Sequence, residues 1–237
     1  MTAVVEPGLD ENASADLAAA SLALARRFAA GATLWCVAPA WEPHAQHVAV
    51  EFVHPVVVGT RALPAVALAG PDLVGTARVS ARRGDVLLAV AGASDADVRS
   101  IMQRAPAWGI TTIWVGSGPR PPAGSADHLL WIDEEDPLVP ATGRFVLLYH
   151  LLWELTHVCF EHPGLLAEEP ADCTDEVCVT CSDEGRLAEV ISVEPGSARV
   201  RTAQGTESIA TVLVEPVAVD ELLLVHAGMA IGKVEQL

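Results

Sequence analysis

The chain has 237 residues, of which 31 are aspartate or glutamate and 14 are lysine or arginine, so its net charge is −17. A surface this negative repels nucleic acid and anionic membranes, and it suits cations or basic protein partners. No apolar run reaches the roughly 18 residues of a membrane span, the acidic N-terminal stretch lacks the basic region of a secretory signal, and five unevenly placed cysteines do not suggest a secreted disulfide framework. We therefore expect a cytoplasmic protein with reduced thiols.

The first two thirds of the chain contain four segments with helix signals. Ser14 is placed to cap the first segment and Gly31 to end it. Pro43 stands in the first turn of the second, and Ser94 is placed to cap the third. The predicted helices are 14–31, 43–53, 94–109 and 142–161.

Short apolar runs alternate with these helices. Each has the length and the β-branched or aliphatic composition of a buried strand. The predicted strands are 33–38, 63–69, 85–91, 111–116 and 128–132. Strands that alternate with helices indicate an α/β domain with a mainly parallel sheet and helices on both faces.

The composition changes after the last helix pattern. Residues 162–176 are rich in proline and acids and predict a linker. Beyond them come short β-branched runs with turn signals at 195–196 and 204–205, which are typical of a small all-β barrel. We place the boundary near residue 168, with an α/β domain over 1–168 and a barrel with a cysteine-rich leading segment over 169–237.

Three cysteines lie close together in residues 173–185, CTDEVCVTCSDEG, with the spacing C-x4-C-x2-C. A C-x2-C pair often marks zinc, but a structural site needs four ligands, and Cys173, Cys178 and Cys181 supply three. Zinc would therefore need a histidine or a ligand from another chain. A thioredoxin-like redox pair is less favoured, because no βαβ unit follows the motif.

The string ELLLVHAGMAIGKVE near the C-terminus resembles the end of the HypC/HupF family, small chaperones that mature [NiFe]-hydrogenases. The closing strand pair of that family is matched by residues 223–231, and its histidine corresponds to His226. The family cysteine normally follows the start methionine, whereas here it is internal. Cys181 precedes Gly185 at about the family distance and is the preferred equivalent, with Cys178 as the alternative.

This resemblance covers roughly residues 173–236 and implies an OB-like barrel with a transfer role. In the family a cysteine helps to hold iron that carries CO and cyanide ligands, together with a HypD-like scaffold protein, and the hydrogenase large-subunit precursor is the expected recipient. A soft thiolate such as that of Cys181 suits low-spin iron, and the imidazole of His226 can donate a hydrogen bond or coordinate.

The N-terminal part resembles the sugar isomerase (SIS) fold, and within it the phosphoheptose isomerase branch. The resemblance is carried by residues 45–69, 84–117 and 147–157. It implies an SIS-type sandwich of a parallel sheet between helices, which assembles as a dimer or tetramer through the first and last long helices.

Two loops that bind phosphosugar in this family are degenerate here. The first, VAPAW, has lost its glycines and carries Trp41 in place of a hydroxyl. The second, VAGASD, keeps Ser94 but has lost most hydroxyls, and Asp95 would repel a phosphate. Both changes argue against a phosphosugar substrate.

Three of the four metal or acid/base groups of the isomerase branch remain. They are His47 and Glu51 on the second helix and His150 on the last, while Thr142 stands at the family's glutamine. A spacing of four places His47 and Glu51 on one helix face. Each helix repeats the pattern His-x3-Glu-x2-His, so two facing stripes could form a metal site. The other interpretation is polar groups inherited at a subunit interface or on a solvated face.

Three functions are therefore weighed. The first is a hydrogenase maturation factor whose N-terminal domain serves oligomerisation or docking. The second is an SIS-type phosphosugar isomerase, with or without zinc, for which Glu51 and His150 are the candidate catalytic groups. The third is a regulator that senses a small molecule, such as a phosphosugar, in a degenerate SIS pocket. The sequence favours the first.

Overall fold

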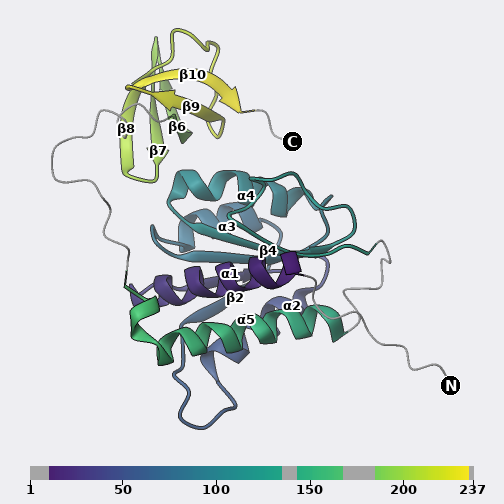
Figure 1. The fold of residues 1–237 in the computed structure, drawn as a ribbon. Coiled ribbons are helices and arrows are strands. Elements are labelled where there is room, and N and C mark those ends of the chain that lie inside the picture. Colours follow the sequence, from purple (N-terminus) through teal and green to yellow (C-terminus); the bar gives the residue numbers. More distant parts are fainter. Residues whose placement is uncertain (1–10, 135–142, 168–184, 235–237) are drawn as a thin grey trace.

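The computed structural model describes residues 11–134, 143–167 and 185–234. These residues form a five-stranded parallel sheet between layers of helices, followed by a closed five-stranded barrel (Figure 1). Both parts of the predicted fold class are confirmed. The boundary near residue 168 and most of the predicted linker lie outside the described residues.

The sheet has the strand order β2-β1-β3-β4-β5, and all its pairs are parallel. All five residues of the central strand β3 are buried, which explains its continuous apolar sequence. The strands are β1 (Leu34–Val37), β2 (Ala65–Leu68), β3 (Val86–Val90), β4 (Thr111–Ser117) and β5 (His128–Ile132).

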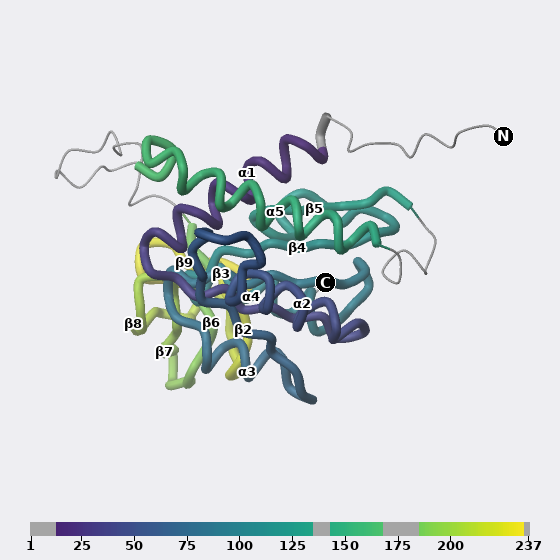
Figure 2. Tube along the Cα trace, turned by 90° about the horizontal axis from the view of Figure 1, so that it is seen from below, coloured from purple at the N-terminus to yellow at the C-terminus, as the bar shows by residue number. Residues whose placement is uncertain are grey.

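Five helices cover the two faces of the sheet. Helices α1 (Glu11–Ala29), α2 (Glu42–Val53) and α5 (Gly143–Glu161) pack on one face, and α1 and α5 run side by side (Figures 1 and 2). Helices α3 (Leu73–Ser80) and α4 (Ala96–Trp108) cover the other face. We call this part of the chain the sheet domain. None of the helices in the described ranges combines the length and apolar character that a bilayer crossing needs.

Three details differ from the predicted elements. Helix α1 starts at Glu11, so Ser14 lies inside the helix and does not cap it. The cap of α4 is Asp95 and not Ser94, because the Asp95 carboxylate accepts a hydrogen bond from the amide of Val98 at 3.0 Å. Helix α3 was not predicted at all, and its cap is Asp72, whose carboxylate accepts from the Gly75 amide at 2.7 Å.

The barrel closes in the order β10-β8-β7-β6-β9 around its own small apolar core. Both predicted turns join hairpins as expected, and a third turn at Ala227 and Gly228 has φ of 47° and 77°, as a two-residue hairpin turn requires. The strands are β6 (Arg186–Glu194), β7 (Ser197–Thr202), β8 (Gly205–Ala210), β9 (Leu222–His226) and β10 (Met229–Val234).

The barrel is packed directly against the sheet domain. Strands β6 and β7 contact α4, and the side chain of Leu222 is part of the apolar cluster beneath α3 and α4. A short 3-10 helix (Pro163–Leu165) follows α5 and is tied to α1. The carbonyl of Leu165 accepts a hydrogen bond from Arg26 Nε at 2.9 Å.

Candidate functional site

The structure brings together the three residues proposed from the second and last long helices. His47 and Glu51 lie one turn apart on α2, and His150 faces them from α5. Nε2 of His47 lies 3.2 Å from Glu51 Oε1 and 3.2 Å from His150 Nε2, and His150 Nε2 lies 3.5 Å from Glu51 Oε1. The site is half open, since the side chain of Glu51 is 19% exposed and those of His47 and His150 are 39% and 44% exposed.

The three converging atoms need a hydrogen or a cation between them. A neutral imidazole nitrogen without its hydrogen and a carboxylate oxygen are all acceptors. Three such atoms at this spacing repel each other unless an imidazole Nε2 carries a hydrogen or a cation binds between them. Two histidines and one carboxylate form a ligand set that catalytic zinc sites use, with a fourth position left for water or substrate. The residues present therefore fit a zinc ion.

The hydroxyl of Tyr149 contacts the ring nitrogen of His47 that points away from the cluster. Its hydroxyl lies 3.1 Å from Nδ1 of His47 and 3.3 Å from Nδ1 of His44. The single phenolic hydrogen can be donated to only one of them, so donation to His44 leaves the oxygen to accept from Nδ1–H of His47. With the hydrogen on Nδ1, the Nε2 lone pair of His47 points toward Glu51 and His150, as metal binding requires. Burial, and secondarily the charge of Glu51, raises the pKa of Tyr149 to about 12, so it stays protonated at neutral pH.

The rest of the two predicted stripes does not join the cluster. Among the described residues, only His47, Glu51 and His150 form a group able to hold a metal ion. His54 follows the end of α2 and is exposed. His157 faces backbone carbonyls, with Nδ1 at 2.8 Å from the oxygen of Trp153 and Nε2 at 3.0 Å from the oxygen of Arg61. Of the six residues in the two predicted stripes, only His47, Glu51 and His150 form the candidate metal site.

The two degenerate loops both lie at the carboxyl edge of the sheet. They follow β1 and β3, neighbouring strands at the point where the strand order reverses, which is where open α/β sheets bind ligands. Trp41 precedes α2, is half-buried and makes no side-chain cap hydrogen bond. Ser94 is exposed, and the Asp95 carboxylate itself occupies an amide at the start of α4. An anionic side chain therefore sits where a helix N-terminus would otherwise receive phosphate.

The candidate residues of the barrel are described only in part. Cys173, Cys178 and Cys181 lie outside the described residues. His226 is the last residue of β9. Arg186 pairs with Val225 in the antiparallel β6–β9 register, so the next position, Gly185, lies across from His226. The chain thus enters the barrel beside His226, four residues after Cys181.

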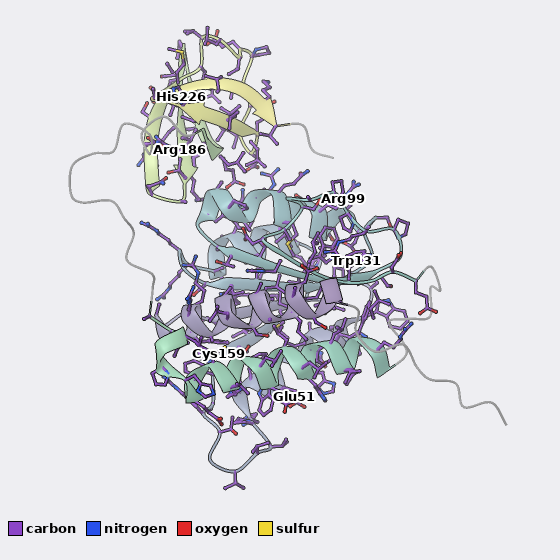
Figure 3. The ribbon with its side chains drawn as sticks, viewed as in Figure 1. Glu51, Arg99, Trp131, Cys159, Arg186 and His226 are labelled. Atoms are coloured by element: carbon purple, nitrogen blue, oxygen red, sulfur yellow. The ribbon has the colours of Figure 1, made fainter. Side chains whose placement is uncertain are left out.

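The two candidate sites are far apart. Figure 3 shows Glu51 near the outer helices of the sheet domain and His226 in the barrel, on the opposite side of the molecule. The remaining cysteines belong to neither site. Cys36 and Cys159 are buried in the sheet domain, and burial raises the pKa of both thiols.

Comparison with known proteins gives a separate result for each domain. Residues 187–237 match the HupF/HypC family. The matched range includes His226 and the β9–β10 hairpin, whereas the three clustered cysteines precede it. The match covers the barrel and not the sheet domain. No curated protein matches the sequence.

Solved structures resemble the sheet domain. A phosphoheptose isomerase from Francisella tularensis has a TM-score of 0.53 at 17% identity, over 61% of this chain and 86% of that protein. The sugar isomerase domain of an RpiR transcription factor from Sphaerobacter thermophilus has a TM-score of 0.46 at 17% identity, over 64% of this chain and 81% of that chain. The first likeness shows that the sheet domain has the SIS fold, as the sequence predicted.

Sequence reasoning missed one residue of the first site. Tyr149 was read as part of an apolar helix, although its position directly before His150 and its polar hydroxyl were visible. The signal was too weak, because only the packing of α5 against α2 brings the hydroxyl to Nδ1 of His47.

Proposed function

We propose that this chain is a [NiFe]-hydrogenase maturation factor. In this proposal the barrel receives or transfers an Fe(CO)(CN)2 unit through Cys181, or alternatively Cys178, and His226 assists. The iron is cargo held in transit between a HypD-like scaffold protein and the hydrogenase large-subunit precursor. The sheet domain assembles the protein as a dimer or tetramer and positions the barrel.

The observation that carries the proposal is the HupF/HypC match over residues 187–237. The match supports a role in hydrogenase maturation in general. The specific transfer chemistry draws support from the register of β6 and β9, which sets Gly185 across from His226. With Cys181 only four residues before this point, about 14 Å of extended chain at most separates the thiol from the histidine's level in the barrel.

Oligomerisation through the long helices has separate support. Leu147 and Val158 of α5, the last long helix, are 56% and 39% exposed. A subunit contact along α5 would remove these large apolar side chains from water. Light scattering of the purified protein measures the mass, and a monomer would contradict this part of the proposal.

Hydrogenase activity in cells tests the function. We would place the chain in a host that lacks every other HypC-type factor and measure the activity of its [NiFe]-hydrogenase. Wild-type chain should restore activity, Cys181→Ala should abolish it, and Cys36→Ala, which removes a buried core thiol, is the matched control. Full activity with both Cys178→Ala and Cys181→Ala would exclude the proposed chemistry.

A second candidate function rests on the cluster of His47, Glu51 and His150. With zinc bound by these three residues, the sheet domain would be an SIS-type phosphosugar isomerase or a phosphosugar-binding regulator. Zinc held there would polarise a carbonyl oxygen, whereas without the metal Glu51 and His150 would be the groups that move protons in the isomerase. The degenerate loops at Trp41 and Asp95 weigh against this candidate.

Sedoheptulose 7-phosphate separates these two versions. Turnover that disappears in Glu51→Gln would support the isomerase. A rise in melting temperature without turnover would support the regulator, because a ligand that binds only the folded state stabilises it. If millimolar sedoheptulose 7-phosphate is neither turned over nor raises the melting temperature, both the isomerase and the regulator are excluded.

A further inference from the structure

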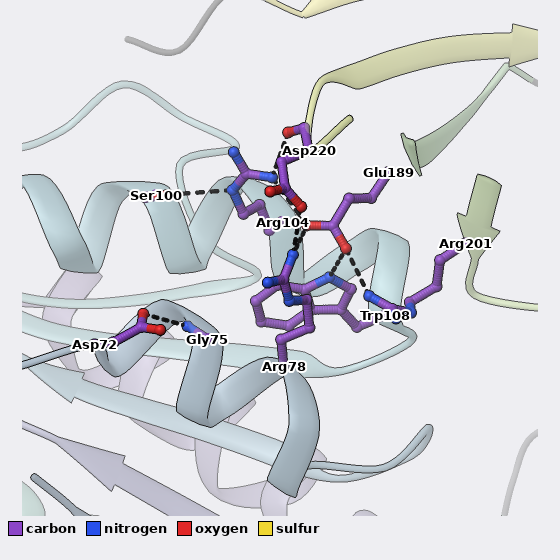
Figure 4. A network of polar contacts seen from close by, with 9 residues as sticks. All are labelled: Asp72, Gly75, Arg78, Ser100, Arg104, Trp108, Glu189, Arg201 and Asp220. Atoms are coloured by element: carbon purple, nitrogen blue, oxygen red, sulfur yellow. Dashed lines mark hydrogen bonds and ion pairs between the residues drawn. The ribbon is translucent and has the colours of Figure 1, made fainter. Parts of the chain in front are cut away.

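The contact between the two domains is centred on a buried carboxylate. Glu189 of β6 is 1% exposed. Its Oε1 accepts a hydrogen bond from Arg104 Nη1 of α4 at 2.9 Å, and its Oε2 accepts from Trp108 Nε1 at 3.0 Å and from Arg201 Nη1 at 2.7 Å (Figure 4). A buried carboxylate is costly unless its oxygens are bonded and its charge is balanced. Glu189 obtains two of these three donors from the other domain.

A second carboxylate of the barrel also contacts an arginine of the sheet domain. Arg78 Nη1 of α3 lies 2.6 Å from Asp220 Oδ1 of the barrel and 3.6 Å from Glu189 Oε1. Arg104 also donates to the carbonyl of Asp220 at 2.8 Å. The sheet domain thus contributes two arginines, and the barrel contributes two carboxylates and Arg201. In a chain with 31 acidic and 14 basic side chains, two arginines on one small patch are a substantial share.

Apolar side chains surround the charged centre. Leu222 is 2% exposed and Trp108 is 6% exposed, and both belong to the cluster beneath α3 and α4. Leu187 and Val234 of the barrel pack against the same cluster. Gly109 follows α4 with φ of 73°, and a Cβ there would lie 3.4 Å from the carbonyl of Ala203 in the β7–β8 turn. Removing the barrel would expose Trp108 and leave Arg104 without its carboxylate.

We propose that the α3–α4 face of the sheet domain is a dedicated binding surface for the barrel. This surface holds the barrel even when the chain that connects the two domains is cut. The partner that this surface fits is a small β-barrel with one carboxylate between apolar side chains. The inference is independent of the cargo chemistry proposed above. In this proposal the sheet domain, whose phosphate loops are degenerate, serves to bind the barrel. Leu222, at the start of β9, packs against the sheet domain, and His226 ends the same strand. Docking therefore fixes the position of His226 relative to the sheet domain.

Cleaving the chain between the domains tests this proposal. A protease recognition sequence is introduced within residues 168–184 of the full-length chain, and the purified protein is cut. At micromolar concentration the two halves should elute together in size-exclusion chromatography and appear as one complex in native mass spectrometry. Separation of the wild-type halves under these conditions would overturn the proposal.

Matched arginine variants identify the surface. Arg104→Ala should weaken the affinity of the cut halves by roughly tenfold or more, because it leaves Glu189 short of a charge. Arg186→Ala is the control, since Arg186 pairs with Glu207 inside the barrel at 2.7 Å. Arg78→Ala, at a partly exposed position, provides a second reading if Arg104→Ala does not fold. Equal affinities for the two interface variants and the control would contradict the proposal.

Discussion

The imidazole of His47 is held at both ring nitrogens, by Tyr149 at Nδ1 and by Glu51 and His150 at Nε2. This arrangement fixes the orientation of the ring before any ion arrives. Hydrogen bonds of this kind to the remote nitrogen are common among metal-binding histidines and are worth roughly 10- to 100-fold in affinity.

Zinc titration calorimetry tests this cluster. In a background in which Cys173, Cys178 and Cys181 are serine, we expect Zn²⁺ binding that His47→Ala or Glu51→Gln abolishes. Tyr149→Phe should weaken binding by about 10-fold or more, because His47 loses its orienting bond. Lowering the pH should also weaken binding, because protons compete for the histidines. His54→Ala is the exposed control, and equal binding by wild type and His47→Ala would contradict the site.

His128 gives a pH-dependent contribution to stability. Burial lowers the pKa of His128, outweighing the opposing charges of Asp127 and Asp16. Below about pH 6.5 the unfolded chain therefore takes up this proton while the folded chain does not, so stability is lost as the pH falls through this window. Urea unfolding between about pH 7.5 and pH 5.5 should show a flatter pH dependence for His128→Gln than for wild type. Parallel curves would contradict this assignment.

At the scale of elements, apolar runs were sufficient to predict every strand of the sheet. The five strands lie within the predicted segments or extend them by one residue. Helix α3 was missed because it spans only eight residues and buries little beyond Leu73 and Ala77. Caps were harder to predict, since Ser94 and Asp95 are both good capping residues and only the observed geometry shows which one bonds the Val98 amide.

A pair of substitutions tests the cap of α4. Asp95→Ala should lower the free energy of unfolding by about 1 kcal/mol, because the Val98 amide loses its acceptor. Ser94→Ala, at the neighbouring exposed position, should change it by less than about 0.5 kcal/mol. Chemical denaturation of both variants measures the difference. A larger loss of unfolding free energy in Ser94→Ala than in Asp95→Ala would indicate that Ser94 is the cap.

At the scale of the whole molecule, the two domains share one buried ionic network. The sequence could not reveal it, because Glu189 bonds Arg104, which lies 85 positions away, and reads in the sequence as an ordinary strand residue. Trp108 packs among apolar side chains, and its indole N–H also bonds Glu189. The cluster of His47, Glu51 and His150 was predictable, since the family pattern placed all three positions, whereas Tyr149 and the domain contact depend on tertiary packing.

Removing the central carboxylate should destabilise the whole chain. Glu189→Ala leaves Arg104 buried without its partner, and breaking a buried pair costs about 3–5 kcal/mol. Glu207→Ala removes the more exposed pair with Arg186 and should cost about 1 kcal/mol or less. Calorimetry should show a single transition in wild type. Two separate transitions, or equal losses in the two variants, would contradict a shared network.

Infrared spectroscopy of the anaerobically purified protein tests the central claim most directly. The chain is coexpressed with its maturation partners, and wild type is compared with Cys178→Ala, Cys181→Ala and His226→Ala. We expect bands of iron-bound CO and cyanide in wild type that vanish in Cys181→Ala. A protein without such bands, with zinc at the three clustered cysteines instead, would contradict the claim and make the barrel a structural zinc module.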